Sequence, residues 1–194
     1  QGTPPQQLMA GPTAFALRAR IVVPVSQPAI EDGAVFVFRG RIAAVGPWRD
    51  LRRKAPAHVR DLGEAILLPG LVNAHCHLDY TDMAGAIPPP KSFLDWIQGI
   101  VALKSSWSYT DFAQSWLNGA RQLLRSGCTT VADIEAVPEL LPEVWAATPL
   151  RVLSFLEIIS VRRRQRPATL LRQAVQKLRE LPPGRSRAAL SPHA

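Results

Sequence analysis

Residues 66–79 read ILLPGLVNAHCHLD, an apolar run that ends in His-x-His. The run predicts a buried strand with His75 and His77 at its end. Successive side chains of a strand point to opposite faces, so these two imidazoles are expected to share a face. Neutral imidazole binds zinc, iron, nickel or copper, and the pair would supply half of a metal site. The alternative interpretation is two histidines in a polar loop.

Strands and helices alternate after residue 65. Strands are predicted at 68–77, 128–133, 150–159 and 187–193, with helices that begin near Ser92, Thr110, Pro138 and Pro167. This alternation is typical of an α/β fold with a parallel sheet. A closed (β/α)8 TIM barrel takes about 250 residues. Residues 65–194 are therefore expected to form an incomplete barrel, its first half, truncated at residue 194.

Three segments carry a resemblance to a known family. The run LPGLVNAHCH at 68–77 resembles the first barrel strand of the amidohydrolase superfamily, and GCTTVAD at 127–133 is similar to its second strand. The terminal LSPHA at 190–194 resembles the strand with the family's third metal-binding histidine. The branch that these motifs resemble is that of the metal-dependent aminohydrolases and deaminases, which includes cytosine deaminase, chlorohydrolases and aminodeoxyfutalosine deaminase. In that family the histidine comes at the fifth strand, so either a short strand near Trp145 is missing from the prediction or this chain departs from the pattern.

The resemblance implies a metal site and a reaction. His75, His77 and His193 would bind one divalent metal, zinc first and iron as the alternative. The family's catalytic Glu, a further His and a late Asp would follow residue 194, so the general acid–base is not assigned here. A metal-bound hydroxide would attack a ring carbon that bears an amino group, which is hydrolytic deamination of a small N-heterocycle.

The N-terminal part of the chain reads differently. Residues 13–64 predict short strands and turns, with a hairpin around Arg39-Gly40, where glycine supplies the positive φ of a tight turn. This pattern resembles the N-terminal part of the small β-sandwich that precedes the amidohydrolase barrel. Residues 1–12 are rich in Gln, Pro, Gly and Thr and are expected to be a disordered tail.

Other polar and aromatic residues are candidates for contact with substrate. Asp79 follows the histidine pair. Trp96 lies on an apolar helix face, where packing in the core or beneath a lid is favoured over substrate stacking. Glu157 ends an apolar strand, where barrel enzymes place working residues, but it could equally pair with an arginine. Asp133 is expected to have a structural hydrogen-bonding role.

Charge and composition limit the kinds of partner and the cellular compartment that are expected for this protein. The 194 residues carry a net charge of +8, but the basic residues are spread out, and the cluster at 162–166 reads as a solvated loop, so no nucleic-acid partner is expected. No apolar run is long enough to cross a membrane, and no signal peptide is visible. With only two cysteines, Cys76 and Cys128, a reducing cytoplasm is the default. Cys76 is expected to be a small core residue. The sequence does not decide the oligomeric state, and a homo-oligomer is one possibility.

Several functions other than deamination stay open. The same hydroxide could hydrolyse a cyclic amide or a ring C–Cl bond. A non-catalytic, arginine-rich module that binds nucleic acid belongs to another class, and bound metal would distinguish the two. A truncated, inactive paralogue is a further alternative, and the fragment by itself is expected to be inactive.

Overall fold

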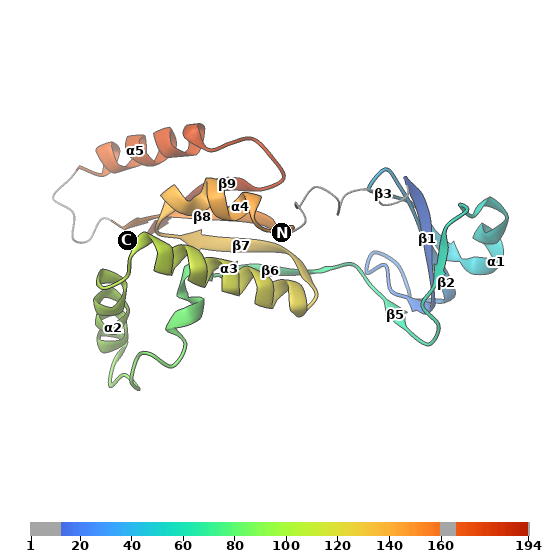
Figure 1. The fold of residues 1–194 in the computed structure, drawn as a ribbon, viewed down its shortest axis with the longest axis horizontal. Helices are drawn as coiled ribbons and strands as arrows, with labels where there is room; N and C mark the ends of the chain where they lie inside the picture. Colours follow the sequence, from blue (N-terminus) through green and yellow to red (C-terminus); the bar gives the residue numbers. More distant parts are fainter. Residues whose placement is uncertain (1–12, 160–165, 194) are drawn as a thin grey trace, which may run out of the picture. The chain divides into compact units, whose positions relative to one another are not determined.

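The computed structural model describes residues 13–159 and 166–193 (Figure 1). The chain divides into two compact units, residues 1–69 and residues 70–194, and each is described by itself. The tail predicted at 1–12 and most of the basic cluster predicted as a loop lie outside the described residues. Within the described residues, no helix has the length and apolarity that a membrane span needs.

The first unit is built on one mixed sheet. Its strands are β1 (Ala14–Val22), β2 (Ile30–Phe38), β3 (Arg41–Pro47), β4 (Val59–Asp61) and β5 (Ile66–Leu67). The order is β3-β2-β1-β4, and β5 also pairs with β1. Strand β2 is antiparallel to its neighbours β1 and β3, whereas β4 and β5 run parallel to β1.

Local sequence explains the turn and the cover of this sheet. Arg39 and Gly40 both have positive φ, 48° and 73°, so the predicted hairpin turn is confirmed. The short helices α1 (Trp48–Leu51) and η2 (Arg52–Lys54) follow β3, and Trp48 packs against the small buried cluster around Phe36. The described residues of this unit form a single sheet, so its place in a two-layer sandwich stays a prediction.

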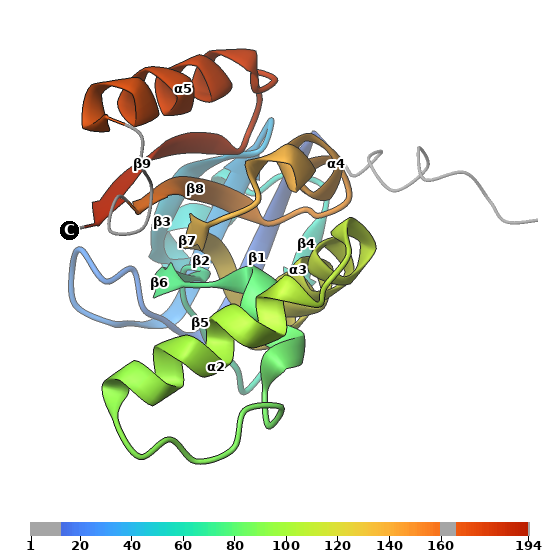
Figure 2. The same cartoon turned by 90° about the vertical axis from the view of Figure 1, so that its left-hand side faces the viewer.

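The second unit contains four parallel strands in the order β6-β7-β8-β9, side by side in Figure 2. They are β6 (Leu71–Cys76), β7 (Cys128–Glu135), β8 (Arg151–Ile159) and β9 (Arg187–His193). Between them lie η3 (Leu78–Met83), α2 (Phe93–Ser105), α3 (Tyr109–Arg125), η4 (Pro138–Leu140), α4 (Leu141–Ala146) and α5 (Pro167–Glu180). The predicted parallel α/β order is confirmed. Trp145 lies in α4, so no strand forms there and residue 193 belongs to the fourth parallel strand.

Capping residues set the ends of the helices. Ser92 Oγ accepts a hydrogen bond from the Asp95 N–H at 3.1 Å, as the sequence predicted for the start of α2. Helix α3 begins at Tyr109 and not at Thr110, because Ser108 and Asp111 form a reciprocal capping box. Gly127, with φ of 84°, ends α3 and lets the chain turn into β7.

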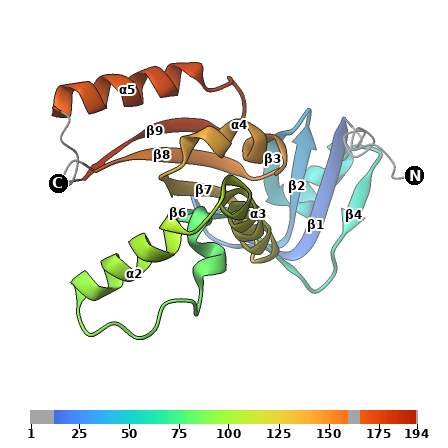
Figure 3. The ribbon, with the colours of Figure 1, turned by 60° about the vertical axis from the view of Figure 1, so that its left-hand side comes forward.

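The core of the second unit lies between the sheet and the helices α3 and α4, which Figure 3 shows beside β7 and β8. Trp116 of α3 and Val144 of α4 are fully buried against Val131 and Val152 of the sheet. Packing of these two surfaces against each other buries apolar area that would otherwise be in contact with water. This burial is the main source of stability for a helix layer on a sheet.

Two expectations of burial were wrong. Strand β6 pairs only with β7 among the described strands, so Val72 is 66% exposed and not buried. On α2 only Ile100 is buried, while Phe93 is 76% exposed, because little of the described chain packs on that helix.

Candidate metal centre and buried carboxylates

His75 and His77 come together at the carboxyl end of β6. Their ring centres are 5.6 Å apart, with the rings edge to face at 78°. The backbone before the pair is shaped by Asn73, whose Oδ1 accepts a hydrogen bond from the His75 N–H at 3.1 Å. Two imidazoles that bind one zinc ion at about 2 Å place their ring centres within roughly 6 Å of each other. The pair therefore fits a shared divalent metal.

Cys76, between the two histidines, belongs to the other face of the strand. It is half-buried and packs against the core of the second unit. Burial, with the charges of Asp133 and Asp79, raises the pKa of its thiol to about 12. Its packing against the core confirms the expectation of a small core residue.

The third histidine of the prediction is described only by its backbone. Residue 193 of β9 pairs with residue 159 of β8, and Ser191 pairs with Glu157. The side chain of His193 lies outside the described part of the structure. Among the described side chains, no group of three His, Cys, Asp or Glu residues is arranged to bind a metal. The assignment of His193 as a ligand stays a prediction.

Asp133 of β7 is a structural residue. It is fully buried and accepts hydrogen bonds from the Leu78 N–H at 2.9 Å and the Trp116 indole N–H at 3.1 Å. Ser154 Oγ donates a third bond at 3.4 Å. Burial raises the pKa of Asp133 to about 7 despite these bonds. The predicted structural role is confirmed, because Asp133 joins the segment after the histidines to α3 and β8.

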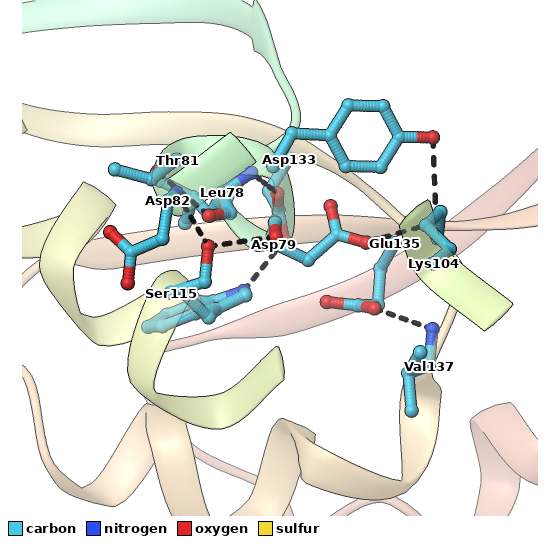
Figure 4. A network of polar contacts seen from close by, with 11 residues as sticks. Leu78, Asp79, Thr81, Asp82, Lys104, Ser115, Asp133, Glu135 and Val137 are labelled. Atoms are coloured by element: carbon cyan, nitrogen blue, oxygen red, sulfur yellow. Dashed lines mark hydrogen bonds and ion pairs between the residues drawn. The ribbon is translucent and has the colours of Figure 1, made fainter. Parts of the chain in front are cut away.

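Asp79 also lies in this buried layer (Figure 4). Its side chain has no exposed surface, and its Oδ2 is 3.2 Å from the ammonium nitrogen of Lys104. Burial raises the pKa of Asp79 to about 6, although Lys104 acts in the opposite direction. Its Oδ1 has no hydrogen-bond partner among the described residues. A role for Asp79 toward substrate stays a prediction.

Glu135, the last residue of β7, was not predicted as a site residue from the sequence. Glu135 is fully buried; its Oε1 accepts a hydrogen bond from the Val137 N–H at 2.5 Å, and its Oε2 has no partner among the described residues. Burial, with the charges of Asp133 and Asp79, raises its pKa well above the ordinary value. The signal that could have found it is the one used for Glu157, a carboxylate at the end of an apolar parallel strand.

Glu157 and Trp96 lie in more open surroundings. Glu157 is partly exposed and, together with Glu135 and residues of α5, lines a cavity of about 410 Å³. Trp96 is 41% exposed and contacts Phe93 with the ring centres 5.7 Å apart. Trp96 is not packed into the core of the described chain, and packing beneath a lid stays a prediction. Substrate contact by either residue stays a prediction.

Lys104, near the end of α2, was also missed. Its ammonium nitrogen contacts Asp79 Oδ2 and lies 3.4 Å from Tyr80 Oη. Burial lowers the pKa of Lys104, but the charges and hydrogen bonds of Asp79 and Tyr80 outweigh burial and raise it. Lys104 is therefore a partly buried cation at neutral pH, and its signal in the sequence was only a single lysine in the last turn of a mostly apolar helix.

The sequence and the fold of this chain are similar to those of known proteins. The sequence profile of the amidohydrolase family matches residues 66–184, which is more than half of the chain. The chain belongs to the amidohydrolase family. The resemblance inferred from the histidine motif is confirmed.

Named relatives of this amidohydrolase chain include a 5-methylthioadenosine/S-adenosylhomocysteine deaminase of Nitratidesulfovibrio vulgaris, strain Miyazaki F. The two are 34% identical over 112 residues, which is 57% of this chain and 25% of that protein. The aminofutalosine deaminase of Helicobacter pylori, solved with methylthio-coformycin, has a TM-score of 0.77 at 22% identity, over 92% of this chain and 44% of that one. A zinc-bound adenosine deaminase of Xanthomonas campestris has a TM-score of 0.70 at 23% identity, over 92% and 42%.

These comparisons support the fold of amidohydrolase barrel proteins. They also show that the chain spans about a quarter of the curated relative and less than half of each solved chain.

Proposed function

We propose that this chain is the first half of the catalytic barrel of a zinc-dependent aminohydrolase that hydrolytically deaminates an amino-substituted N-heterocycle. The observation that carries the proposal is the histidine pair. His75 and His77 lie at the carboxyl end of the first parallel strand, and the centres of their imidazole rings are 5.6 Å apart. The chain that carries them belongs to the amidohydrolase family. In barrels of this kind the working residues gather at that end of the strands.

Three histidines of this chain would bind the metal. His75 near the end of β6 and His77 directly after it would each offer an imidazole nitrogen, and His193 ends β9. The zinc-bound deaminase among the solved neighbours supports zinc over iron. When bound, such an ion lowers the pKa of a coordinated water toward neutrality and so supplies a nucleophile.

Other residues of the chain would support and complete the site. Asp133 accepts a hydrogen bond from the Leu78 N–H and thereby fixes the backbone that follows His77. Glu157 and Trp96 are proposed to contact the heterocycle, the first by hydrogen bonding and the second by stacking. The general acid–base is assigned to a Glu in the part of the longer relatives that this chain does not span. The chain alone is therefore expected to be inactive.

The nature of the substrate is proposed from the curated relatives. The first is named as a deaminase of 5-methylthioadenosine and S-adenosylhomocysteine, both adenine nucleosides. Another, from Deinococcus radiodurans, is named aminodeoxyfutalosine deaminase. An amino-purine nucleoside is the proposed substrate class, and cyclic amides and chlorinated rings are the alternatives to be assayed beside it.

The test uses the intact gene product, purified with zinc. Release of ammonia from 5-methylthioadenosine, adenosine, guanine and aminodeoxyfutalosine is measured beside hydrolysis of a cyclic amide and a chlorotriazine. Deamination that is lost in His75→Ala and kept in His58→Ala supports the proposal, because His58 is an exposed histidine of the first unit. Hydrolysis of only the cyclic amide or the chlorotriazine would replace deamination with that activity, and no activity on any of them would contradict the catalytic assignment.

A further inference from the structure

Lys104 connects helix α2 to the segment that follows the histidine pair. Its side chain is only 18% exposed, and its Nζ lies 3.2 Å from Asp79 Oδ2 and 3.4 Å from Tyr80 Oη. The ion pair with Asp79 is drawn in Figure 4. Helix α2 makes few other close contacts with the described chain. Lys104 is therefore its main polar connection to the segment that follows the candidate metal site.

Tyr80 carries this connection to a proposed metal ligand. Its ring is stacked on the imidazole of His77, with the ring centres 4.5 Å apart and the planes at 20°. The Nζ of Lys104 lies 4.5 Å from the centre of the same Tyr80 ring. Lys104, Tyr80 and His77 thus form a continuous series of contacts. A cation that holds an aromatic ring limits the orientations open to the imidazole stacked on that ring.

The backbone of this segment does not need Lys104. Asp133 accepts the Leu78 N–H at 2.9 Å. Ser115 Oγ donates to the carbonyl of Asp79 at 2.8 Å and accepts from the Asp82 N–H at 2.9 Å. These bonds come from β7 and α3 and hold the main chain of η3. What Lys104 adds is the placement of two side chains, those of Asp79 and Tyr80.

Stability alone is a poor explanation for a partly buried lysine paired with a fully buried carboxylate. Removing an ammonium and a carboxylate from water is expensive, and well-packed apolar residues of the same size are often as stable as a buried ion pair. Lys104 already lies beside the ring of Phe112, 5.7 Å from its centre, where an apolar side chain would also pack. The charge is better explained by a role in fixing geometry.

We propose that Lys104 is a positioning residue for the metal site, which orients the imidazole of His77 through the ring of Tyr80. This inference rests on the proposed function, because it takes His77 to be a metal ligand. Residues that orient a metal ligand typically change metal affinity about 10- to 100-fold when they are replaced. Lys104 should therefore matter more for metal affinity than for folding.

The test is a zinc titration of the intact gene product, freed of metal, against a chromophoric chelator. Lys104→Met keeps the length of the side chain and removes its charge, and it is expected to weaken zinc binding at least about tenfold. Tyr80→Leu removes the ring that contacts both partners and is expected to cause a similar loss. Lys104→Arg is expected to restore most of the affinity. Tyr80→Leu also serves if Lys104→Met fails to fold.

A matched control is Lys177→Met, which removes a lysine that also pairs with a carboxylate, that of Glu139, but lies on α5 and is exposed. It should leave zinc affinity unchanged. If the wild-type protein binds zinc through His77 and both Lys104→Met and Tyr80→Leu bind it equally tightly, the positioning role is wrong and the metal site stands. If His77→Ala binds zinc as tightly as the wild type, the metal site itself is wrong and the positioning role fails with it.

Discussion

Two sets of polar residues lie at the same carboxyl ends of β6 and β7, and they differ in the side of the sheet they occupy. His75 is exposed and His77 is partly exposed. Asp133 and Glu135, on the neighbouring strand, are fully buried. The partners of Asp133 come from α3, β8 and the segment after β6. On these two strands the polar residues on the helix side are buried and hydrogen-bonded, whereas the two histidines on the other side reach the surface.

The largest expected effect comes from the buried side. Asp133→Ala should destabilise the protein by about 3 kcal/mol, because it leaves the Leu78 N–H and the Trp116 indole N–H buried without an acceptor. Denaturant unfolding of the intact gene product measures this. Asp82→Ala is the control: Asp82 is exposed in the same segment, and its loss should change the free energy of unfolding by less than about 1 kcal/mol. Equal effects of the two substitutions would remove the distinction between the two faces.

A smaller effect is expected where α3 approaches the segment after the histidines. A Cβ at Gly119 would lie 2.3 Å from Thr81 Oγ1 and 3.0 Å from Leu78 Cδ2. Gly119→Ala should therefore lower the free energy of unfolding by about 1–2 kcal/mol, although alanine is the better helix former. The control is Gly184→Ala, because a Cβ there meets nothing within 4 Å. A Gly119→Ala protein as stable as the wild type would mean that this segment yields easily and is not held rigidly by α3.

The smallest expected effect is on how the free energy of unfolding depends on pH. Burial, with the charges of Asp133 and Asp79, holds the pKa of Glu135 above its ordinary value of about 4.3. The folded protein therefore keeps a proton that the unfolded chain releases. The stability that Glu135 contributes is present below pH 4 and is lost as the pH rises toward the folded-state pKa. The free energy of unfolding of Glu135→Gln, relative to that of the wild type, should increase between pH 5 and pH 8.

Denaturant unfolding at several pH values measures this difference. Burial raises the pKa of Glu139, but the hydrogen bond and charge of Lys177 outweigh it and lower that pKa overall. Glu139→Gln should thus differ from the wild type by a constant amount between pH 5 and pH 8. Parallel pH profiles for Glu135→Gln and the wild type would show that Glu135 is ionised in the folded protein.

The sequence was informative where periodicity or a motif has one structural outcome. The parallel strands, the cap at Ser92 and the hairpin at Arg39-Gly40 follow from local rules, and the family follows from the His-x-His run. Burial was harder to predict, because it depends on what covers an element. The apolar residues of β6 and α2, among them Val72 and Phe93, are exposed since little of the described chain packs on them.

The site was predicted only in its outline. His75 and His77 were found because strand alternation places both on one face. Lys104 was missed, because its partners Asp79 and Tyr80 are 24 or more residues away and become neighbours only in the fold. Glu135 was missed although it ends an apolar strand as Glu157 does, and its burial shows only in the fold. Asp133 was assigned its structural role correctly, although its partner Trp116 could not be identified from sequence.

The most direct test measures zinc affinity and the free energy of unfolding on the same three metal-free proteins: the intact gene product, His75→Ala and Asp133→Asn. His75→Ala should lose more than about tenfold in zinc affinity, with a free energy of unfolding within about 1 kcal/mol of the wild type, since His75 is exposed. Asp133→Asn should show mainly a loss of stability. If His75→Ala binds zinc as tightly as the wild type, the exposed histidines are not the metal site, and the proposed function is wrong.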